Sequence, residues 1–369
     1  MCRLFVRLVL PLCLTLFAAS TLGAPSLRNQ RDTLPQGDWL EYRVPLQAGQ
    51  RPPCCFQWQG GQIGKHGCRL QDKPGGFGTS DDQPAAAVGS ALRILLQRSE
   101  QGFARILAVA EQCPVDAGSA QLRDIGEIEA AASVELLAQR IEGDGRRERS
   151  EGLHALALHA GPQADEALER MAVSGSKGVR DDAVFWLAQA RVESGFQQVR
   201  RLLDSASKDL TGRLVFALSV SPVPAAKPAL RAIATDHLHA GTRSEALFWL
   251  AQTSDPQAEA ILQQALRNDP DQAVRRKAVF AISQLPAEHT VPILRGLVEQ
   301  KSESRELRKE ALFWLAQIDD AAVVPVFDDL LGIGKHWPPT SRPERVASPY
   351  VQIGLRIPKR TAAFQLVVI

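Results

Sequence analysis

The chain has almost no excess charge and few of the residues on which catalysis depends. Its 43 Lys and Arg residues nearly balance 41 Asp and Glu residues, giving a formal net charge of +2. A nucleic-acid surface normally shows as an excess of basic residues, so we predict no nucleic-acid partner. The sequence also lacks a Gly-x-Ser-x-Gly motif, a Walker-type phosphate loop and a His-Glu-x-x-His motif. These are signatures of common hydrolases, nucleotide-binding proteins and zinc enzymes, so we predict no catalytic residues.

Histidine is scarce and scattered. The seven histidines are His66, His154, His159, His237, His239, His289 and His336. Only His237 and His239 are close-set, and residues two apart on a helix point in different directions. We read them as part of a polar loop and predict no metal site and no cofactor.

After residue 23 no segment is long and apolar enough to cross a membrane. Residues 1–23 instead follow the order of a secretory signal peptide: Arg3 and Arg7, an apolar run at 8–18, then small residues, with cleavage expected between 20 and 24. A retained N-terminal anchor is the alternative. Cys13 follows leucine rather than a small residue, which argues against lipid attachment. We expect an exported protein, either periplasmic or extracellular.

Cysteines are few, and their number after the signal peptide is even. Removing the signal peptide leaves Cys54, Cys55, Cys68 and Cys113, an even number in a chain bound for an oxidising compartment. We predict two disulfides; free thiols and a metal site are the alternatives, although zinc sites want cysteines two to four residues apart. A bond between neighbouring cysteines would be strained, so Cys54 and Cys55 should each pair with Cys68 or Cys113.

The region 34–118 has the pattern of a small antiparallel β-rich domain. Short apolar runs at 39–44, 56–58 and 103–109 suggest strands, and glycine and proline clusters at 60–61, 73–76 and 82–84 suggest turns. Residues 127–142 then form an alanine-rich amphipathic pattern, which predicts a helix that caps the following domain. After residue 331 the pattern stops, and 332–369 is either a disordered tail, a partner-binding strand or an atypical terminus.

Between residues 149 and 331 one sequence motif recurs at a nearly fixed interval. Ala-Leu/Val-Phe-Trp-Leu-Ala-Gln occurs around Phe185, Phe248 and Phe313, with weaker copies at Phe216, Phe280 and His154. The steps between these marker residues are 31, 31, 32, 32 and 33 residues. A fixed period of this size is typical of a solenoid, in which each unit buries its apolar face against its neighbours. We predict a mostly α protein with an α-α superhelix of about six two-helix repeats behind the disulfide-stapled β-rich domain.

Each repeat reads as helix A, a turn and helix B. In the best example the turn holds Asp255-Pro256, where Asp can cap and Pro suits the first helical position. Helix B is apolar on one side, whereas the apolar residues of helix A cover more than half of its circumference. We therefore expect helix A to be buried on most sides, against its own helix B and the neighbouring helices A.

The pattern resembles the short HEAT-like repeats of the phycobilisome-lyase type. The resemblance covers about half of the chain and rests on the period, on Val179-Arg180, Val274-Arg275 and Leu307-Arg308, on the alanines Ala183, Ala278 and Ala311, and on the Asp-Pro-like turn. It implies the fold, while the function it implies ranges from chromophore lyase and diiron hydroxylase to binding scaffold. The hydroxylase is marked by His-Glu pairs, which this chain lacks, and an exported protein would not meet phycobiliproteins.

One row of side chains suggests a binding surface. Four of the marker phenylalanines have a glutamine one turn later, on the same side of the helix. These pairs are Phe185 and Gln189, Phe248 and Gln252, Phe280 and Gln284, and Phe313 and Gln317. The row either serves packing between repeats, with the amides satisfying the backbone or one another, or is partly open and recognises an extended peptide.

A second row consists of arginines five residues before the marker: Arg149, Arg180, Arg243, Arg275 and Arg308. A buried arginine generally needs a partner, so we expect pairing with acidic residues such as Asp181, Asp255 or Asp319, with an anion-binding groove as the alternative.

These observations predict an exported, non-enzymatic protein-interaction scaffold that uses the concave surface of the solenoid, made by the helices B, to bind an unknown protein or an extended peptide. Two alternatives stay open. One is a HEAT-like lyase or enzyme-maturation factor, and the other is a regulatory subunit held at a membrane surface by 332–369.

Overall fold

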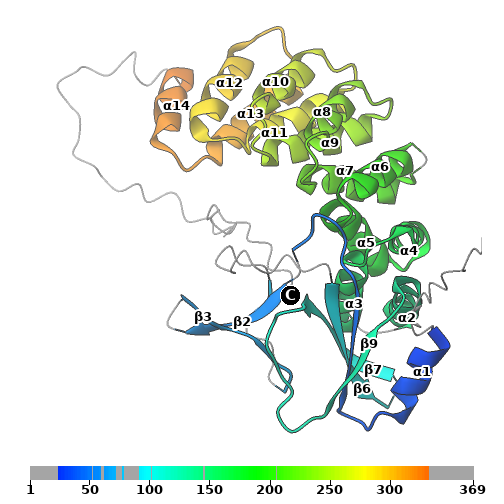
Figure 1. The fold of residues 1–369 in the computed structure, drawn as a ribbon. Coiled ribbons are helices and arrows are strands. Elements are labelled where there is room, and N and C mark those ends of the chain that lie inside the picture. Colours follow the sequence, from blue (N-terminus) through cyan, green and yellow to red (C-terminus); the bar gives the residue numbers. More distant parts are fainter. Residues whose placement is uncertain are drawn as a thin grey trace, which may run out of the picture. The chain divides into compact units, whose positions relative to one another are not determined.

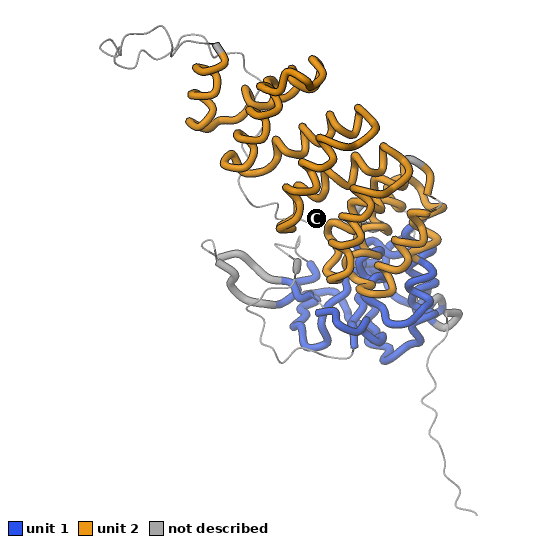
Figure 2. The backbone as a smooth tube through the Cα atoms, turned by 90° about the horizontal axis from the view of Figure 1, so that it is seen from above, with its two compact units in different colours: residues 1–144, 151–167 blue, residues 145–150, 168–369 orange. Residues whose placement is uncertain are grey.

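The computed structural model describes residues 24–51, 53–59, 62–71, 77–78, 91–100, 102–143, 146–204 and 206–331. The predicted signal peptide, the three predicted turns and the tail 332–369 lie outside the described residues. The chain divides into two compact units, unit 1 with residues 1–144 and 151–167 and unit 2 with residues 145–150 and 168–369 (Figure 2). No helix in the described part of the chain is long and apolar enough to span a membrane.

Unit 1 begins with a helix and then builds a sheet whose strand order is β7-β6-β1-β9 (Figure 1). Its elements are α1 (Ala24–Thr33), β1 (Trp39–Pro45), β6 (Ala91–Ser99), β7 (Gly102–Ala110) and β9 (Leu122–Glu127). Smaller sheets contain β2 (Cys54–Gln59), β3 (Gln62–His66) and β5 (Phe77–Gly78), and β4 (Cys68–Arg69) with β8 (Val115–Asp116). The three strands predicted from sequence lie within β1, β2 and β7.

The expectation of a purely antiparallel domain is wrong. β9 runs parallel to β1, and β4 runs parallel to β8. Both parallel pairs join strands far apart in the sequence, because a parallel neighbour needs a long connection rather than a hairpin. A sequence pattern that finds hairpins from turn residues has no signal for such pairs.

Two disulfides lie in the core of unit 1. Cys54 is bonded to Cys113 and Cys55 to Cys68, so each neighbouring cysteine pairs with a distant one, as predicted. All four are buried beside Trp39 in one apolar cluster. One bridge therefore ties β2 to β4, and the other ties β2 to the segment that follows β7.

A buried polar chain joins β1 to the helices that follow the sheet, α2 (Ala130–Gly143) and α3 (Arg146–Ala157). The Tyr42 hydroxyl lies 2.9 Å from the Ser133 hydroxyl, which lies 2.7 Å from His159 Nε2. His159 Nδ1 is 2.7 Å from the Ala155 carbonyl oxygen, which only accepts. In neutral His159 the Nδ1–H therefore donates and Nε2 accepts from Ser133. Since all three side chains are fully buried, this Ser-His pair serves structure rather than nucleophilic catalysis.

The repeats form six helix pairs. The helices A are α3, α5 (Lys177–Ala190), α7 (Lys208–Val220), α9 (Ala240–Gln252), α11 (Gln272–Ile282) and α13 (Arg305–Ala316). The helices B are α4 (Pro162–Ser174), α6 (Val192–Leu203), α8 (Ala226–Asp236), α10 (Ala258–Asn268), α12 (Ala287–Glu299) and the short η2 (Ala321–Val323) with α14 (Val324–Leu331). The last five pairs lie in unit 2, whereas α3 and α4 contribute residues to both units.

The two helix layers of unit 2 are not equally dense. From α5 to α13 each helix A packs directly on the next helix A, whereas packing between successive helices B is extensive only for α8 and α10. A stack of helix pairs curves toward the layer whose helices lie closer together. The concave side is therefore made by the helices A, and our expectation that the helices B make it is wrong. Small residues in the helices A, such as Ala246 and Ala278, allow this close approach.

Helix A is also less buried than its composition suggests. In α9 the buried residues are Thr242, Arg243, Ala246, Leu247 and Leu250. Phe248 and Trp249 are only half-buried, and Gln252 is exposed. Large aromatic residues thus occupy the solvent side of the helix, which is why the helical wheel overestimates the buried arc.

Candidate binding surface

The marker phenylalanines occupy the solvent side of the helices A. Ala246 and Leu250, two residues before and after Phe248, are fully buried. At 100° per residue each lies about 160° around the helix from Phe248, so the phenylalanine is opposite the core. The same arrangement holds in α5, α7, α11 and α13. Phe185, Phe216, Phe248 and Phe280 are half-buried, and Phe313 is 55% exposed.

Six rings of these helices form one continuous series, which we call the aromatic stripe. Its members, in spatial order, are Phe216, Trp249, Phe248, Phe280, Trp314 and Phe313. Successive ring centroids are 4.6, 4.9, 5.7, 4.9 and 5.0 Å apart. The stripe therefore crosses four helices A without a break. Phe185 makes a separate pair with Trp186 at 5.2 Å.

The phenylalanine row packs between repeats and is also partly exposed, and its role in binding stays a prediction. The Phe248 and Phe280 rings, from neighbouring repeats, are nearly parallel at 8°, which is packing between repeats. Yet none of the six rings is buried, and a contiguous apolar surface rimmed by polar residues is typical of interaction sites. Aromatic side chains also carry much of the energy of protein interfaces.

The four glutamines behave differently from one another. Gln189 donates a hydrogen bond to the Val220 carbonyl oxygen of the next helix A, and Gln284 donates to the Ser283 hydroxyl at 3.0 Å. Gln252 and Gln317 are exposed. The amides therefore do not form a uniform ladder.

Lys277 lies in the middle of the aromatic stripe. Its Nζ is 4.9 Å from the Phe248 ring centroid and 5.0 Å from that of Phe280. An ammonium near an aromatic ring is attracted by the negative face of the ring. This cation therefore sits on the stripe itself, at the joint between two repeats.

The arginine row has a structural role. Arg243 makes two hydrogen bonds of 2.8 Å to the Asp269 carboxylate and one of 2.7 Å to the His237 carbonyl oxygen. Arg275 donates to Leu266 O at 2.7 Å and pairs with Glu303 at 2.6 Å. Arg308 donates to Val298 O at 2.9 Å. These three arginines thus bind carbonyl groups at the end of the preceding helix B, where carbonyl groups lack helical partners.

The expected acidic partners of these arginines were wrong. Asp181 pairs with Arg213 at 3.0 Å and Asp255 with Arg231 at 2.7 Å. Carboxylates in the turn before the next helix A, Asp269 and Glu303, take that place instead. Their recurrence in this turn was a signal in the sequence. With these partners in place the row offers no open anion-binding groove at Arg243 or Arg275.

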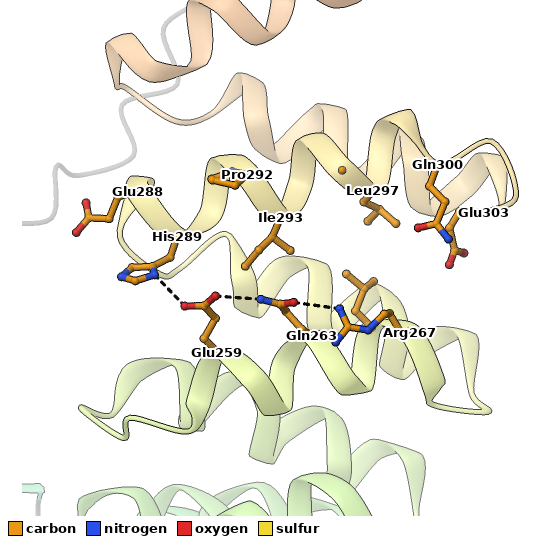
Figure 3. Close-up of a pocket in the computed structure, with 12 residues that line it drawn as sticks. Glu259, Gln263, Arg267, Glu288, His289, Pro292, Ile293, Leu297, Gln300 and Glu303 are labelled. Atoms are coloured by element: carbon orange, nitrogen blue, oxygen red, sulfur yellow. Dashed lines mark hydrogen bonds and ion pairs between the residues drawn. The ribbon is translucent and has the colours of Figure 1, made fainter.

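A groove of about 480 Å³ lies between α10 and α12, on the helix-B layer (Figure 3). Along it His289 Nδ1 is 2.8 Å from Glu259, Gln263 donates to Glu259 at 2.9 Å, and Arg267 donates to Gln263 at 3.0 Å. Leu266, Ile293 and Leu297 contribute the apolar lining. These four polar side chains are already bonded to one another, so the groove is the weaker candidate for a binding surface.

Histidine geometry gives no support for metal chemistry. The rings of His237 and His239 are 5.5 Å apart, and the His239 amide donates to His237 Nδ1 at 3.1 Å. Burial and the neighbouring His239 lower the pKa of His237. Within the described ranges, no three His, Cys, Asp or Glu side chains gather as a metal site would require.

The fold is that of a HEAT-like α-solenoid. Residues 227–304 match the family model of HEAT repeats, which confirms the resemblance and the fold class predicted from sequence. No curated protein matches the chain.

Several solved structures are similar over about half of the chain. Human deoxyhypusine hydroxylase in complex with glycerol is 15% identical, with 54% of this chain and 90% of that chain covered and a TM-score of 0.25. The complex of CpcE and CpcF of phycocyanin lyase from Nostoc is 18% identical, covering 51% and 83%, with a TM-score of 0.25. A designed armadillo repeat protein is 19% identical, covering 51% and 92%, with a TM-score of 0.25. Two are enzymes and one is a designed repeat protein, so these likenesses leave the function of this chain open.

Proposed function

We propose that this protein is a non-enzymatic protein-interaction scaffold, and that the aromatic stripe binds an extended peptide segment of a partner. The observation that carries the proposal is the unbroken series of six unburied rings across four helices A. Repeat solenoids present long surfaces of this kind to extended partners. Lining such a surface with rings costs solubility, which a binding role would explain.

We further propose that the protein works outside the reducing cytosol, in the periplasm or in the extracellular space. Two observations support this location: the signal-like residues 1–23 and the two disulfides of unit 1. Structural disulfides persist in oxidising compartments and are rare in the cytosol. The lyase-type and membrane-surface functions have no comparable support among the described residues.

The test is an affinity capture from an envelope extract with the mature, oxidised protein as bait, followed by quantitative mass spectrometry. The wild type is compared with Phe248→Ala plus Phe313→Ala. The matched control is Ile293→Ala, which removes a half-buried apolar side chain from the groove on the helix-B layer. We expect the stripe variant to lose its partner by at least about tenfold, as two interface anchors would predict, while the control keeps it.

The opposite pattern, with loss only in Ile293→Ala, would move the contact surface to the helices B and overturn the proposal. Gln252→Ala tests the amide contribution separately, since this exposed side chain lies one turn from Phe248. Stoichiometric metal or a coloured cofactor in the purified sample would instead support an enzyme.

A further inference from the structure

The charges beside the aromatic stripe are unevenly compensated. α11 carries three cations, Arg275, Arg276 and Lys277, and no acidic residue. Arg275 is paired with Glu303. For Arg276 and Lys277 the described part of the chain provides no carboxylate within ion-pair distance. α11 therefore carries two cations without an ion pair, and that of Lys277 lies on the stripe itself.

At the register of Lys277, two of the other helices A carry a charged residue that is paired. Three residues before their markers, α5 and α7 carry Asp182 and Arg213, paired with Arg149 at 3.4 Å and with Asp181 at 3.0 Å. Lys277 holds the same position in α11 but rests on two rings instead. Glu245 in α9 and Glu310 in α13 flank it at this register without reaching ion-pair distance. A carboxylate from elsewhere would thus meet an open cation.

The spacing of the helices fits one backbone conformation of a bound segment. Packed helices are about 8–10 Å apart, and a polyproline II segment advances about 3.1 Å per residue with three residues per turn. Every third residue would therefore meet the equivalent position of the next helix A. Recognition of such segments on aromatic surfaces is a recurring mode, because the segment loses little entropy on binding.

Resting on the proposed function, we infer that the partner segment is apolar and extended with an acidic residue at its centre. Its carboxylate pairs with Lys277 and Arg276, and its apolar side chains at three-residue spacing contact Phe248, Phe280 and Phe313. Charge complementarity at Lys277 fixes the register, while the rings provide the contact area.

The test measures binding of three fluorescein-labelled peptides by fluorescence polarisation to the full oxidised protein. Each is a twelve-residue sequence of leucine and proline with leucine at every third position, differing only in a central Asp, Asn or Lys. We expect the Asp peptide to bind about fivefold tighter than the Asn peptide at low salt, and the Lys peptide weakest. Lys277→Gln should narrow the difference between the Asp and Lys peptides, because Arg276 remains, and Lys277→Glu should abolish it.

The matched control is Lys227→Glu, which makes the same change in net charge at an exposed residue of α8, a helix of the other layer. It should leave the ranking unchanged. If Phe248→Ala weakens all three peptides while Lys277→Glu leaves their ranking as in the wild type, the stripe binds peptides and the acidic specificity is wrong. If no peptide binds the wild type, the inference fails, and the capture experiment alone decides the proposed function.

Discussion

At the scale of single residues, arginine side chains connect successive repeats where the backbone makes no hydrogen bonds. The last carbonyls of each helix B lack helical partners, and the arginines of the next helix A supply donors to them. Arg243 is the most buried example, with its side chain 9% and that of Asp269 6% exposed. The pair therefore connects one repeat to the next at a position that is largely shielded from solvent.

Replacing Arg243 by lysine should destabilise the protein by about 2–3 kcal/mol, because an ammonium cannot make the two parallel bonds to Asp269 and also reach the His237 carbonyl. Urea denaturation followed by circular dichroism measures the change. Lys277→Gln, an unpaired cation on the neighbouring helix, is the control and should shift the midpoint little. Equal effects of both would contradict the importance of the bidentate geometry.

The same pair gives stability a pH dependence. Burial alone would raise the pKa of Asp269, but hydrogen bonds from Arg243 and from the Asp271 amide outweigh it and lower that pKa. A carboxyl whose pKa is lower in the folded state stabilises above its unfolded value and loses that contribution as pH falls. The wild type should thus exceed Asp269→Asn in stability by the largest amount at pH 7, and this difference should shrink below about pH 4.

Protonation of His154 should also lower the stability of unit 1 at acid pH. Burial lowers the pKa of His154 to about 4, whereas the unfolded chain binds the proton near pH 6.5. Protonation therefore favours unfolding as pH falls from about 6.5 to 4, at a cost of about 3 kcal/mol. His154→Phe, the residue that later repeats carry here, should remove this loss. Unfolding titrations at several pH values would contradict the prediction if both proteins lost stability equally.

At the scale of helices, one connection differs from all the others. α5 and α6 are joined through Arg191 alone, and Val192 has a φ of 45°, which β-branched residues rarely adopt. Gly195 makes the turn possible, since a Cβ there would lie 1.8 Å from the Leu187 carbonyl oxygen.

Gly195→Ala should therefore destabilise unit 2 by several kcal/mol, or force the α5–α6 turn to open, because backbone atoms cannot give way as a flexible side chain can. The matched control is Gly212→Ala in α7, where a Cβ meets no atom within 4 Å. That change should stabilise by about 0.5–1 kcal/mol through lower chain entropy and better helix propensity. Thermal unfolding measures both, and a destabilised Gly212→Ala would contradict the argument.

The helices themselves were predictable, whereas their relative burial was not. The period of the phenylalanine markers is a local property of the chain and predicts six helix pairs. Which side of helix A meets water depends on how close the neighbouring helices come, and this follows from Ala246 and Ala278 facing other repeats. The aromatic stripe was thus found as a row of residues, while its exposure and the cation of Lys277 resting on it needed coordinates. The parallel pairing of β9 needed them for the same reason.

At the scale of the whole molecule, the two units are stabilised by different means. Unit 2 depends on contacts between successive helices, so its stability is approximately a sum over neighbouring repeats. Unit 1 is a small sheet domain whose disulfides close loops with sequence separations of 59 and 13 residues. Such loops contribute about 4 and 3 kcal/mol through the unfolded chain.

Reduction should therefore lower the stability of unit 1 and leave that of unit 2 nearly unchanged. Hydrogen exchange followed by mass spectrometry, with and without a dithiol reductant, reads both in one sample. We expect amides of β6 and β7 to lose protection, while amides of α9 to α12 keep it, because no sulfur lies in that segment. Replacing Cys55 and Cys68 together by serine removes only the shorter loop and should cause the smaller loss. Equal loss of protection in β6 and α11 would mean that the two units unfold as one.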